Sequence, residues 1–204
     1  FQGLLVLLAL ALLSLQTVQA GAIEPPVELL KRTSDQVIKI LVDESESLKK
    51  DPDRVYEIVD KYILPHLDDV SMAKLALGKN WRKASKAQKR AFVEEFRNLL
   101  VRTYSKSLLE FKNQRINYFP VNVNDDVKKI SVKAEVIQPG GPPIPLSYRM
   151  RIKNNAWKVY DIKVDGISLV TSYRGTFTQE VRKSGIDGLL KYLRDKNGSL
   201  ASAG

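Results

Sequence analysis

The stretch that decides the fold covers residues 157–177 and reads WKVYDIKVDGISLVTSYRGTF. Its first half alternates apolar and polar residues, which is typical of a half-buried β-strand. The strand ends at Gly166, and the apolar residues after it recur at helical spacing, which predicts an amphipathic helix over residues 167–183. A sheet edge followed directly by a covering helix predicts a mixed α+β fold.

More strands are predicted upstream of this stretch. Over residues 130–136 and 146–153, apolar residues alternate with mostly basic ones, so each strand has one apolar and one basic face. The proline- and glycine-rich segment 139–143 and the two asparagines at 154–155 are turn sequences that would connect antiparallel hairpins. With another strand near residues 118–123, the sequence predicts an antiparallel sheet of about four strands.

The amino-terminal half is predicted to be helical. Apolar residues recur at helical spacing over residues 27–42 and 55–63. Between these segments, the Asp-Pro pair at 51–52 has the form of an N-cap followed by a proline at the first helical position. A shorter helix is expected over residues 70–77 and should end at Gly78.

A long central helix and two closing helices complete the prediction. Ser85 and Gln88 have capping-box spacing, so a helix should begin there and continue to residue 112, about 42 Å at about 1.5 Å per residue. The carboxyl-terminal helices are expected over residues 167–183 and 186–193. Residues 197–204 are small and polar, which is typical of a flexible tail.

The first 22 residues resemble a secretory signal rather than part of the fold. Residues 4–15 are an apolar run too short to span a membrane, and residues 18–20 form a small-x-small cleavage pattern, with cutting expected after Ala20. The alternative is a buried or membrane-anchoring helix. We therefore expect a signal peptide over residues 1–22, a single domain over 23–196 and the tail beyond it.

Composition narrows the possible chemistry. With no cysteine and one histidine, the chain has no disulfides, thiol nucleophile, Cys-rich zinc site or His-rich metal cluster. The formal net charge of +10 favours anionic partners, namely phospholipid headgroups, nucleic acid or an acidic protein face. Export argues against nucleic acid, and the sequence has no basic helix with base-reading spacing.

The sequence offers no enzyme motif. It contains no Gly-x-Ser-x-Gly elbow, phosphate loop or dinucleotide fingerprint. His66 follows a proline at a predicted helix end, where a structural role is expected, and the acidic pairs at 68–69 and 125–126 lie where caps and turns belong. No catalytic residue, metal site or cofactor is therefore predicted.

The inward stripes of the sheet and the long helix are rich in apolar residues. From periodicity alone, the usual outcome is that such side chains fill one another as a packed core. The order of several short motifs, however, resembles the MlaC or toluene-tolerance family, the periplasmic lipid-shuttle proteins of the maintenance-of-lipid-asymmetry system. The motifs are Asp69, Met72-Ala73, Leu77-Gly78, Trp81-Arg82, Gln88, Phe92, Phe96, Leu99-Leu100, Tyr104 and the 157–177 stretch.

This resemblance implies a function. Members of the family hold phospholipid acyl chains in an apolar cavity that helices and a curved antiparallel sheet enclose, open at one end, with the headgroup in solvent. They carry lipid between an outer-membrane lipoprotein–porin complex and an inner-membrane ABC transporter with its substrate-binding ring subunit. The chain would then be a non-enzymatic periplasmic carrier, monomeric, with phospholipid as cargo and no cofactor.

Candidate lipid-lining residues follow from the inward stripes together with the family pattern. They are Met72, Leu75, Leu99, Leu100, Thr103, Tyr104, Leu108, Val132, Val136, Tyr148, Met150, Ile162, Ile167, Val170, Tyr173 and Phe177. Arg149, Arg151, Lys153 and Lys163 are candidates for a docking surface, although a charged strand face is more often simply solvated. Two rival hypotheses remain: an enzyme of cone-shaped α+β fold that uses Asp161 or Asp165 with a tyrosine, and an adaptor module with a packed core.

Overall fold

The structure is a computed structural model, and it describes residues 23–110, 114–124 and 126–202. The expected signal peptide, Asp125 and the last residues of the expected long helix lie outside this part of the chain. Within the described residues, no helix combines the length and apolar character needed to cross a bilayer.

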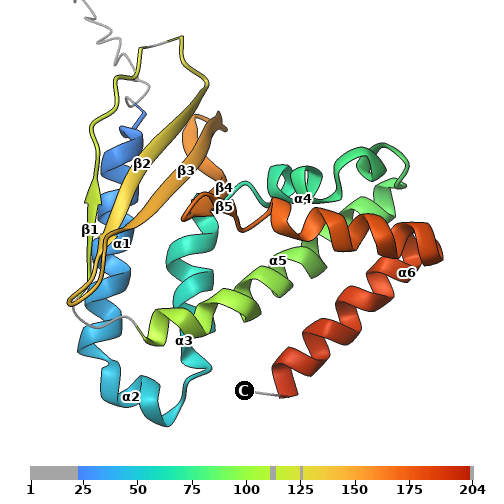
Figure 1. The fold of residues 1–204 in the computed structure, drawn as a ribbon, viewed down its shortest axis with the longest axis horizontal. Helices are drawn as coiled ribbons and strands as arrows, with labels where there is room; N and C mark the ends of the chain where they lie inside the picture. Colours follow the sequence, from blue (N-terminus) through green and yellow to red (C-terminus); the bar gives the residue numbers. More distant parts are fainter. Residues whose placement is uncertain (1–22, 111–113, 125, 203–204) are drawn as a thin grey trace, which may run out of the picture.

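The sheet has five antiparallel strands in the order β1-β2-β3-β4-β5. Their bounds are Arg115–Tyr118, Lys129–Ile137, Ile144–Lys153, Ala156–Val164 and Ile167–Ser168. The pairs Tyr148 with Ile162 and Met150 with Val159 set the register of the central strands, and a β-bulge lies between these pairs. Figure 1 shows the strands at one end of the molecule and helices α4 and α6 at the other, with α5 running between the two ends.

The hairpin predictions are confirmed, with one correction in the first strand. Asn154 and Asn155 both have positive φ angles, 50° and 56°, as the β3–β4 turn requires. The first strand ends at Tyr118, whereas the sequence predicted a strand near residues 118–123. Proline at position 120 has no backbone N–H to donate, so pairing with β2 stops one residue after the last ladder pair, at Phe119.

The amino-terminal half is helical, as predicted. It comprises α1 (Pro26–Asp43), α2 (Ser45–Lys50), α3 (Arg54–Ile58), the π-helix η1 (Val59–Ile63), the short η2 (Leu64–His66), α4 (Asp69–Leu77) and η3 (Gly78–Arg82). Gly78 ends α4 with a φ of 58°. The expected cap at Asp51 is not formed, because α3 begins later and Asp53 occupies the N-cap position without a side-chain hydrogen bond.

The long central helix α5 (Lys86–Leu109) begins where the capping box predicted. The Ser85 hydroxyl accepts a hydrogen bond from the Gln88 backbone N–H at 3.1 Å, and the Gln88 side-chain oxygen accepts one from the Ser85 N–H at 2.9 Å. The last helix, α6 (Arg174–Ser202), contains a kink at Ser184–Gly185 and so forms the two closing arms. It extends through residues expected to be a frayed tail, because the Asn197 amide donates to Glu95 on α5.

The segment between Gly166 and α6 differs from the prediction of a continuous helix from residue 167. Ile167 and Ser168 form β5, and a 3-10 turn η4 (Thr171–Tyr173) precedes α6. The Ser168 hydroxyl accepts hydrogen bonds from the backbone N–H groups of Val170 and Thr171. These local bonds compete with helix formation, so the helix starts seven residues later than expected, at Arg174.

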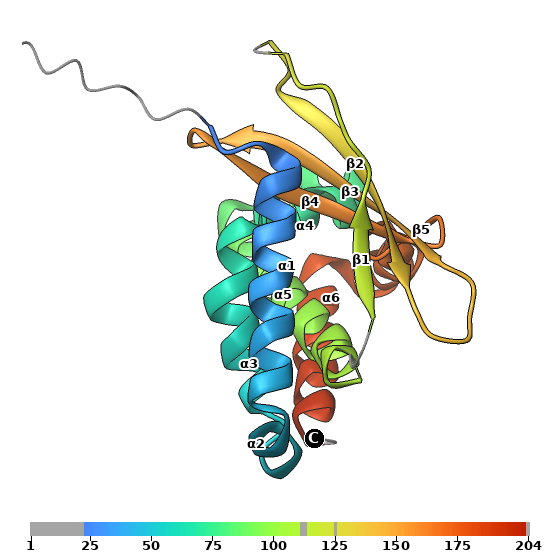
Figure 2. The same cartoon turned by 90° about the vertical axis from the view of Figure 1, so that its left-hand side faces the viewer.

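The apolar interior is divided into three clusters. The first joins α4, α5 and α6 through Phe92, Phe96 and Phe177; the second packs α1 against the inner sheet face; the third joins the end of α1 to α2 and α3. Figure 2 shows α1, α3 and α5 on one side of the curved sheet. Small domains usually have one contiguous core, so a core divided into three clusters is unusual.

Candidate functional site

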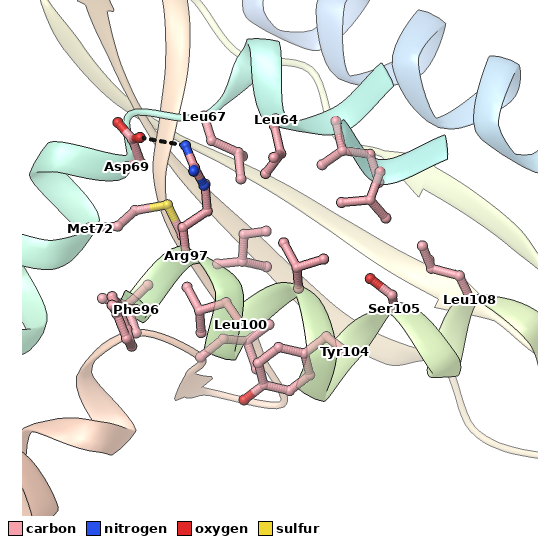
Figure 3. Close-up of a pocket in the computed structure, with 16 residues that line it drawn as sticks. Leu64, Leu67, Asp69, Met72, Phe96, Arg97, Leu100, Tyr104, Ser105 and Leu108 are labelled. Atoms are coloured by element: carbon pink, nitrogen blue, oxygen red, sulfur yellow. Dashed lines mark ion pairs between the residues drawn. The ribbon is translucent and has the colours of Figure 1, made fainter. Parts of the chain in front are cut away.

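An apolar cavity of about 220 Å³ lies where the three clusters approach one another. Figure 3 shows η1 and η2 on one side of it and α5 on the other, with Met72 of α4 at one end. The lining residues are Val59, Ile63, Leu64, Leu67, Asp69, Met72, Phe96, Arg97, Leu100, Val101, Tyr104, Ser105, Leu108, Ile162, Leu169 and Val170.

The division of the core explains why this space remains open. Met72 and Val170 belong to the cluster around α6, Leu67 and Ile162 pack against the sheet–α1 cluster, and Leu108 packs against the third. The cavity wall is therefore made of side chains that pack in different clusters. Hydrocarbon walls that do not contact one another lose dispersion energy, which an apolar guest would restore.

A π-helical turn forms part of the cavity wall. Residues Val59–Ile63 continue α3 with the wider π spacing, and Val59 and Ile63 both line the cavity. Such turns are uncommon and often mark functional positions. The π turn continues into the short helix η2, which contains Pro65, and Leu64 and Leu67 also lie along the same wall.

The cavity has one charged edge. At the start of α4, the Asp69 carboxylate lies 3.7 Å from the guanidinium of Arg97 on α5, and both side chains are a little more than one-third exposed. This distance is longer than that of a charge-assisted hydrogen bond. Arg97, Leu64 and Val101 also line a polar recess of about 440 Å³ next to the cavity. The apolar cavity therefore adjoins a polar recess at its charged edge.

The tyrosine at the cavity wall is held neutral. Burial raises the pKa of the Tyr104 hydroxyl above its usual value, and a hydrogen bond with Tyr173 raises it further. The phenol therefore stays uncharged throughout the physiological range. A neutral ring of this kind contributes apolar surface to the wall without placing a charge beside a hydrocarbon guest.

Six of the sixteen predicted lining residues are brought together around the cavity: Met72, Leu100, Tyr104, Leu108, Ile162 and Val170. The other ten lie elsewhere. Leu99, Tyr173 and Phe177 pack in the cluster around α6, while Val132, Tyr148 and Met150 pack in the sheet–α1 cluster. Leu75 faces a separate basic cleft, Val136 is half-buried on β2, and Thr103 and Ile167 are exposed, Ile167 by 65%.

The difference arises mainly from α1. We expected the inner face of the sheet to surround the cavity, but α1 contributes Leu29 and Leu30 to that face and fills it. Among the described residues of β2, β3 and β4, Ile162 alone lines the cavity. Sequence periodicity shows which face is apolar, but it does not show which helix covers that face.

Several wall residues were missed by the sequence prediction. The apolar stripe over residues 55–63 predicts helix packing for Val59 and Ile63, and the sequence gives no prediction for Leu64 and Leu67, yet all four line the cavity. One usable signal was present in α5, where Leu100, Tyr104 and Leu108 repeat every four residues. That row begins at Phe96, which also lines the cavity.

A basic cleft of about 670 Å³ lies on the outer side of the sheet, next to α4. Its lining residues are Ser71, Lys74, Leu75, Gly78, Lys79, Trp81, Arg82, Lys129, Arg149, Arg151, Tyr160 and Arg174. Two of the four candidate docking residues, Arg149 and Arg151, line it. The Arg149 guanidinium lies 4.9 Å from the Tyr160 ring, and Arg151 donates to the Ser71 hydroxyl, so these arginines are oriented by neighbours rather than freely solvated.

Neither aspartate of the enzyme hypothesis lies at the cavity. Asp161 is fully buried, but it accepts a hydrogen bond from Ser168 at 2.6 Å and lies 3.6 Å from Arg149, on the side of the sheet that faces the basic cleft. Asp165 is an exposed turn residue with a φ of 49°. In the described part of the chain, no group of three His, Cys, Asp or Glu side chains is placed to hold a metal ion.

The lone imidazole also lies outside the cavity wall. Burial lowers the pKa of His66, and the neighbouring cations Arg32 and Lys158 lower it further. Lys158 in turn donates a hydrogen bond to the backbone carbonyl of Pro65. His66 thus lies where the η2 turn meets the sheet, in agreement with the expected structural role.

Comparison with known proteins agrees with this geometry. The sequence model of the family described as MlaC protein matches residues 31–195. The chain belongs to the MlaC family. The match spans α1 through most of α6, so it includes every element that lines the cavity.

Two curated MlaC-family relatives are similar over most of their length. The toluene tolerance protein ttg2D of Pseudomonas putida is 30% identical over 187 residues, which is 91% of this chain and 84% of that protein. The intermembrane phospholipid transport system binding protein MlaC of Haemophilus influenzae is 26% identical over 168 residues, or 81% and 78%.

A solved structure shares the fold. It is the phospholipid-binding protein from Ralstonia solanacearum in complex with a phospholipid, with a TM-score of 0.77 and 29% sequence identity. The similarity covers 85% of this chain and 97% of that one. The α+β fold predicted from sequence is therefore confirmed both by the structure described above and by this phospholipid-binding neighbour.

Proposed function

We propose that this protein is a phospholipid carrier that buries acyl chains in the cavity between η1, η2 and α5. The observation that carries the proposal is an apolar cavity with a single charged edge, in a fold whose Ralstonia relative was solved with a phospholipid. Met72, Leu100, Tyr104, Leu108, Ile162 and Val170 are the predicted residues that we assign to the acyl chains.

The magnitude of the hydrophobic effect explains the need for such a carrier. Two acyl chains hold about 30 methylenes, and exposing each to water costs about 0.8 kcal/mol, on the order of 24 kcal/mol in all. Unassisted transfer of a lipid through an aqueous compartment is therefore negligible. An apolar cavity removes most of that barrier without any chemical reaction, which agrees with a non-enzymatic role.

The cavity must widen to hold a whole lipid. Its volume of about 220 Å³ is below the roughly 300–1,000 Å³ of typical ligand sites. Its walls belong to three separate clusters, so they can move apart without breaking any one of them. We therefore expect lipid entry to separate η1 and η2 from α5.

The site of action that we propose is the bacterial periplasm. There the carrier would exchange lipid between an outer-membrane lipoprotein–porin complex and an inner-membrane ABC transporter with its ring subunit. The name of the Haemophilus relative, an intermembrane phospholipid transport system binding protein, supports this assignment. The basic cleft beside α4 and the net charge of +10 suit docking to acidic surfaces of such complexes.

Mass spectrometry of organic extracts from the purified protein tests the proposal. We expect phospholipid at a stoichiometric level in the wild type and much less in Leu100→Arg, because a guanidinium in the cavity is costly to desolvate. Thr103→Arg is the matched control, since Thr103 is on the same helix but exposed, and it should retain lipid. Wild-type protein without lipid, even after incubation with phospholipid vesicles, would overturn the proposal.

A further inference from the structure

The basic cleft beside α4 collects positive charge from distant parts of the chain. Seven of its twelve lining residues are lysine or arginine, and none of these described lining residues is aspartate or glutamate. They come from α4, η3, β2, β3 and the start of α6. The seven are Lys74, Lys79, Arg82, Lys129, Arg149, Arg151 and Arg174. A concave surface lined by one sign of charge attracts a ligand of the opposite sign.

Four of these cations have no acidic partner. They are Lys74, Lys79, Arg82 and Lys129, and all four are exposed. Within the described part of the chain, no carboxylate forms an ion pair with any of them. Side chains of the same charge repel one another across the cleft, so an anionic occupant would relieve this repulsion.

The cleft also offers apolar contact. Leu75, Trp81 and Tyr160 line it, and all three are half-buried where they pack against the cluster around α6. A peptide segment can supply carboxylates to the cations and an apolar side chain to these three residues. A bilayer surface is flat on this scale and does not enter a cleft of about 670 Å³. The chemistry therefore favours an acidic protein segment that also carries apolar side chains.

Two buried carboxylates lie behind the cleft. The Arg149 guanidinium is 3.6 Å from the Asp161 carboxylate, and the Arg151 guanidinium is 3.6 Å from that of Asp68. Asp68 has further hydrogen-bond donors around it. One oxygen of Asp161, in contrast, has no hydrogen bond within the described structure, where Arg149 is its ion-pair partner. Because Asp161 is fully buried, its charge depends on Arg149 for compensation.

Asp161 also supports part of the cavity wall. Its other oxygen accepts a hydrogen bond from the Ser168 hydroxyl at 2.6 Å, and that hydroxyl accepts one from the Val170 backbone N–H. The Leu169 N–H donates to the Ile162 carbonyl at 2.9 Å. Ile162, Leu169 and Val170 all line the cavity. The contacts of Asp161 therefore join the basic cleft to the cavity wall.

We propose that the basic cleft binds an acidic segment of a partner protein, and that this docking speeds the release of lipid from the cavity. The inference rests on the proposed carrier function. A partner carboxylate accepts hydrogen bonds from the Arg149 guanidinium and draws it away from Asp161. The buried Asp161 charge then loses its compensation, which weakens the turn that carries Leu169 and Val170. The wall opens more often, so lipid leaves faster when the partner is bound.

A binding measurement tests the docking site. The probe is a fluorescein-labelled synthetic peptide of glutamates with leucines between them, and the control peptide has glutamine in place of every glutamate. We expect fluorescence anisotropy to show binding of the acidic peptide only, with an affinity that falls as the salt concentration rises. Wild-type protein that binds neither peptide, or binds both equally, would overturn the proposal.

Charge-reversal variants assign the binding to the cleft. The double variant Lys79→Glu, Arg82→Glu should weaken binding of the acidic peptide by about tenfold or more, because two attractive contacts become repulsive. The matched control is Lys31→Glu, Arg182→Glu, which changes the net charge equally at exposed positions of α1 and α6. Neither control residue lines any cavity, recess or cleft described above, and the control should bind as the wild type does. Equal weakening in both double variants would contradict a site in the cleft.

Lipid transfer tests the link to the cavity. Protein loaded with a fluorescent phospholipid is mixed with acceptor vesicles of dioleoyl phosphatidylcholine, and the rate of lipid loss is measured with and without the acidic peptide. The peptide should raise the wild-type rate several-fold. In Asp161→Asn, the amide oxygen can still accept from Ser168, but the side chain has no charge that requires Arg149. This variant should therefore bind the peptide without any acceleration of lipid loss.

The outcomes separate this inference from the carrier function. A peptide that binds the wild type without changing the transfer rate would overturn the proposal, and this arm needs no variant to fold. Equal acceleration in Asp161→Asn would also overturn it. Binding to phosphatidylglycerol vesicles that requires Lys79 and Arg82, with no binding of the peptide, would assign the cleft to a membrane surface instead. Wild-type protein that takes up no phospholipid would contradict the carrier function itself, while peptide binding would remain measurable.

Discussion

At the scale of single residues, Asp68 joins α4, β3 and β4 through its buried carboxylate and its backbone N–H. Only 1% of its surface is exposed. It caps α4 by accepting from the Ser71 backbone N–H at 3.2 Å and the Ser71 hydroxyl at 2.6 Å, and it accepts from Lys153 of β3 at 2.7 Å. Its own N–H donates to Val159 of β4. This network fixes the start of α4, next to the cavity mouth.

The same network makes stability depend on pH. Burial raises the pKa of Asp68, but the hydrogen bonds from Lys153 and Ser71 outweigh it and hold the pKa below its usual value of 3.8. The ionised carboxylate therefore contributes stability that is fully present above the unfolded pKa. That contribution is lost as the pH falls through the lower pKa of the folded state.

Asp68→Asn should therefore unfold more easily at pH 7, by about 1–3 kcal/mol, because Lys153 loses its anionic partner. Urea unfolding at a series of pH values measures the effect. The gap between wild type and Asp68→Asn should narrow below about pH 4. Asp165→Asn, at an exposed turn where asparagine tolerates the positive φ, should keep the wild-type profile. A gap that stays constant down to pH 3 would show that the Asp68 charge has no role.

Two adjacent leucines on α5 distinguish core from cavity. Leu99 is 2% exposed and packs in the cluster around α6, whereas Leu100 lines the cavity. In delipidated protein, Leu99→Ala should cost about 2–5 kcal/mol, the usual loss for a core leucine. Leu100→Ala should cost less, about 1–2 kcal/mol, because part of the side chain already faces empty space. Equal losses in urea unfolding would mean that Leu100 is ordinary core.

At the scale of elements, the kink in α6 depends on one glycine. Gly185 has φ 71° and ψ −174°, a combination that only glycine adopts readily. The kink turns the second arm so that Leu189, Leu190 and Leu193 reach the same cluster as Phe177 of the first arm. The break between the two predicted closing helices is therefore a folded feature of α6 and not a loose linker.

Gly185→Ala should destabilise the protein by about 1–3 kcal/mol, because the backbone must either strain or straighten. Gly175→Ala is the matched control: that glycine lies in α6 without a positive φ, and a Cβ there would meet nothing within 4 Å. It should leave stability unchanged or raise it by about 0.4–1 kcal/mol. Thermal melting followed by circular dichroism compares the two. A neutral Gly185→Ala would show that the kink is not held by its backbone conformation.

Local sequence signals predicted most elements, and the failures have local causes. The capping box at Ser85 and the asparagine turn at 154–155 depend only on neighbouring residues, so the sequence predicted both. The helix expected from Ile167 failed because apolar spacing there suits a helix, while the Ser168 hydroxyl holds the backbone in a turn. The spacing of apolar residues indicates only which face of an element is apolar. Hydrogen bonds to a single side chain, here Ser168, can prevent the helix that this spacing predicts.

At the scale of the whole molecule, the location of the cavity was the least predictable feature. The sequence identifies Val132 and Met150 as inward-facing and apolar, and both are fully buried. Their partner is α1, however, and the hollow region lies instead against the π-helix and α5. Which apolar faces meet and which stay apart depends on tertiary packing, which periodicity does not report. The family resemblance supplied the expectation of a cavity, but not its walls.

A second, partly apolar recess provides an internal competitor for lipid. It lies at the start of α1 beside the β1–β2 connection, and its lining includes Ile23, Val27, Val121, Val127 and Trp157. It shares no lining residue with the main cavity. The proposed carrier function therefore requires acyl chains to bind in the main cavity rather than in the recess at the start of α1.

Photo-crosslinking with a phospholipid that carries a diazirine in one acyl chain tests this claim most directly. After irradiation and proteolysis, mass spectrometry locates the adducts. We predict adducts on residues 59–72 and 96–108, the two walls of the main cavity, with competition by unlabelled phospholipid. Adducts concentrated around Val27, Val121 and Trp157, or spread over the outer face of the sheet, would contradict the account.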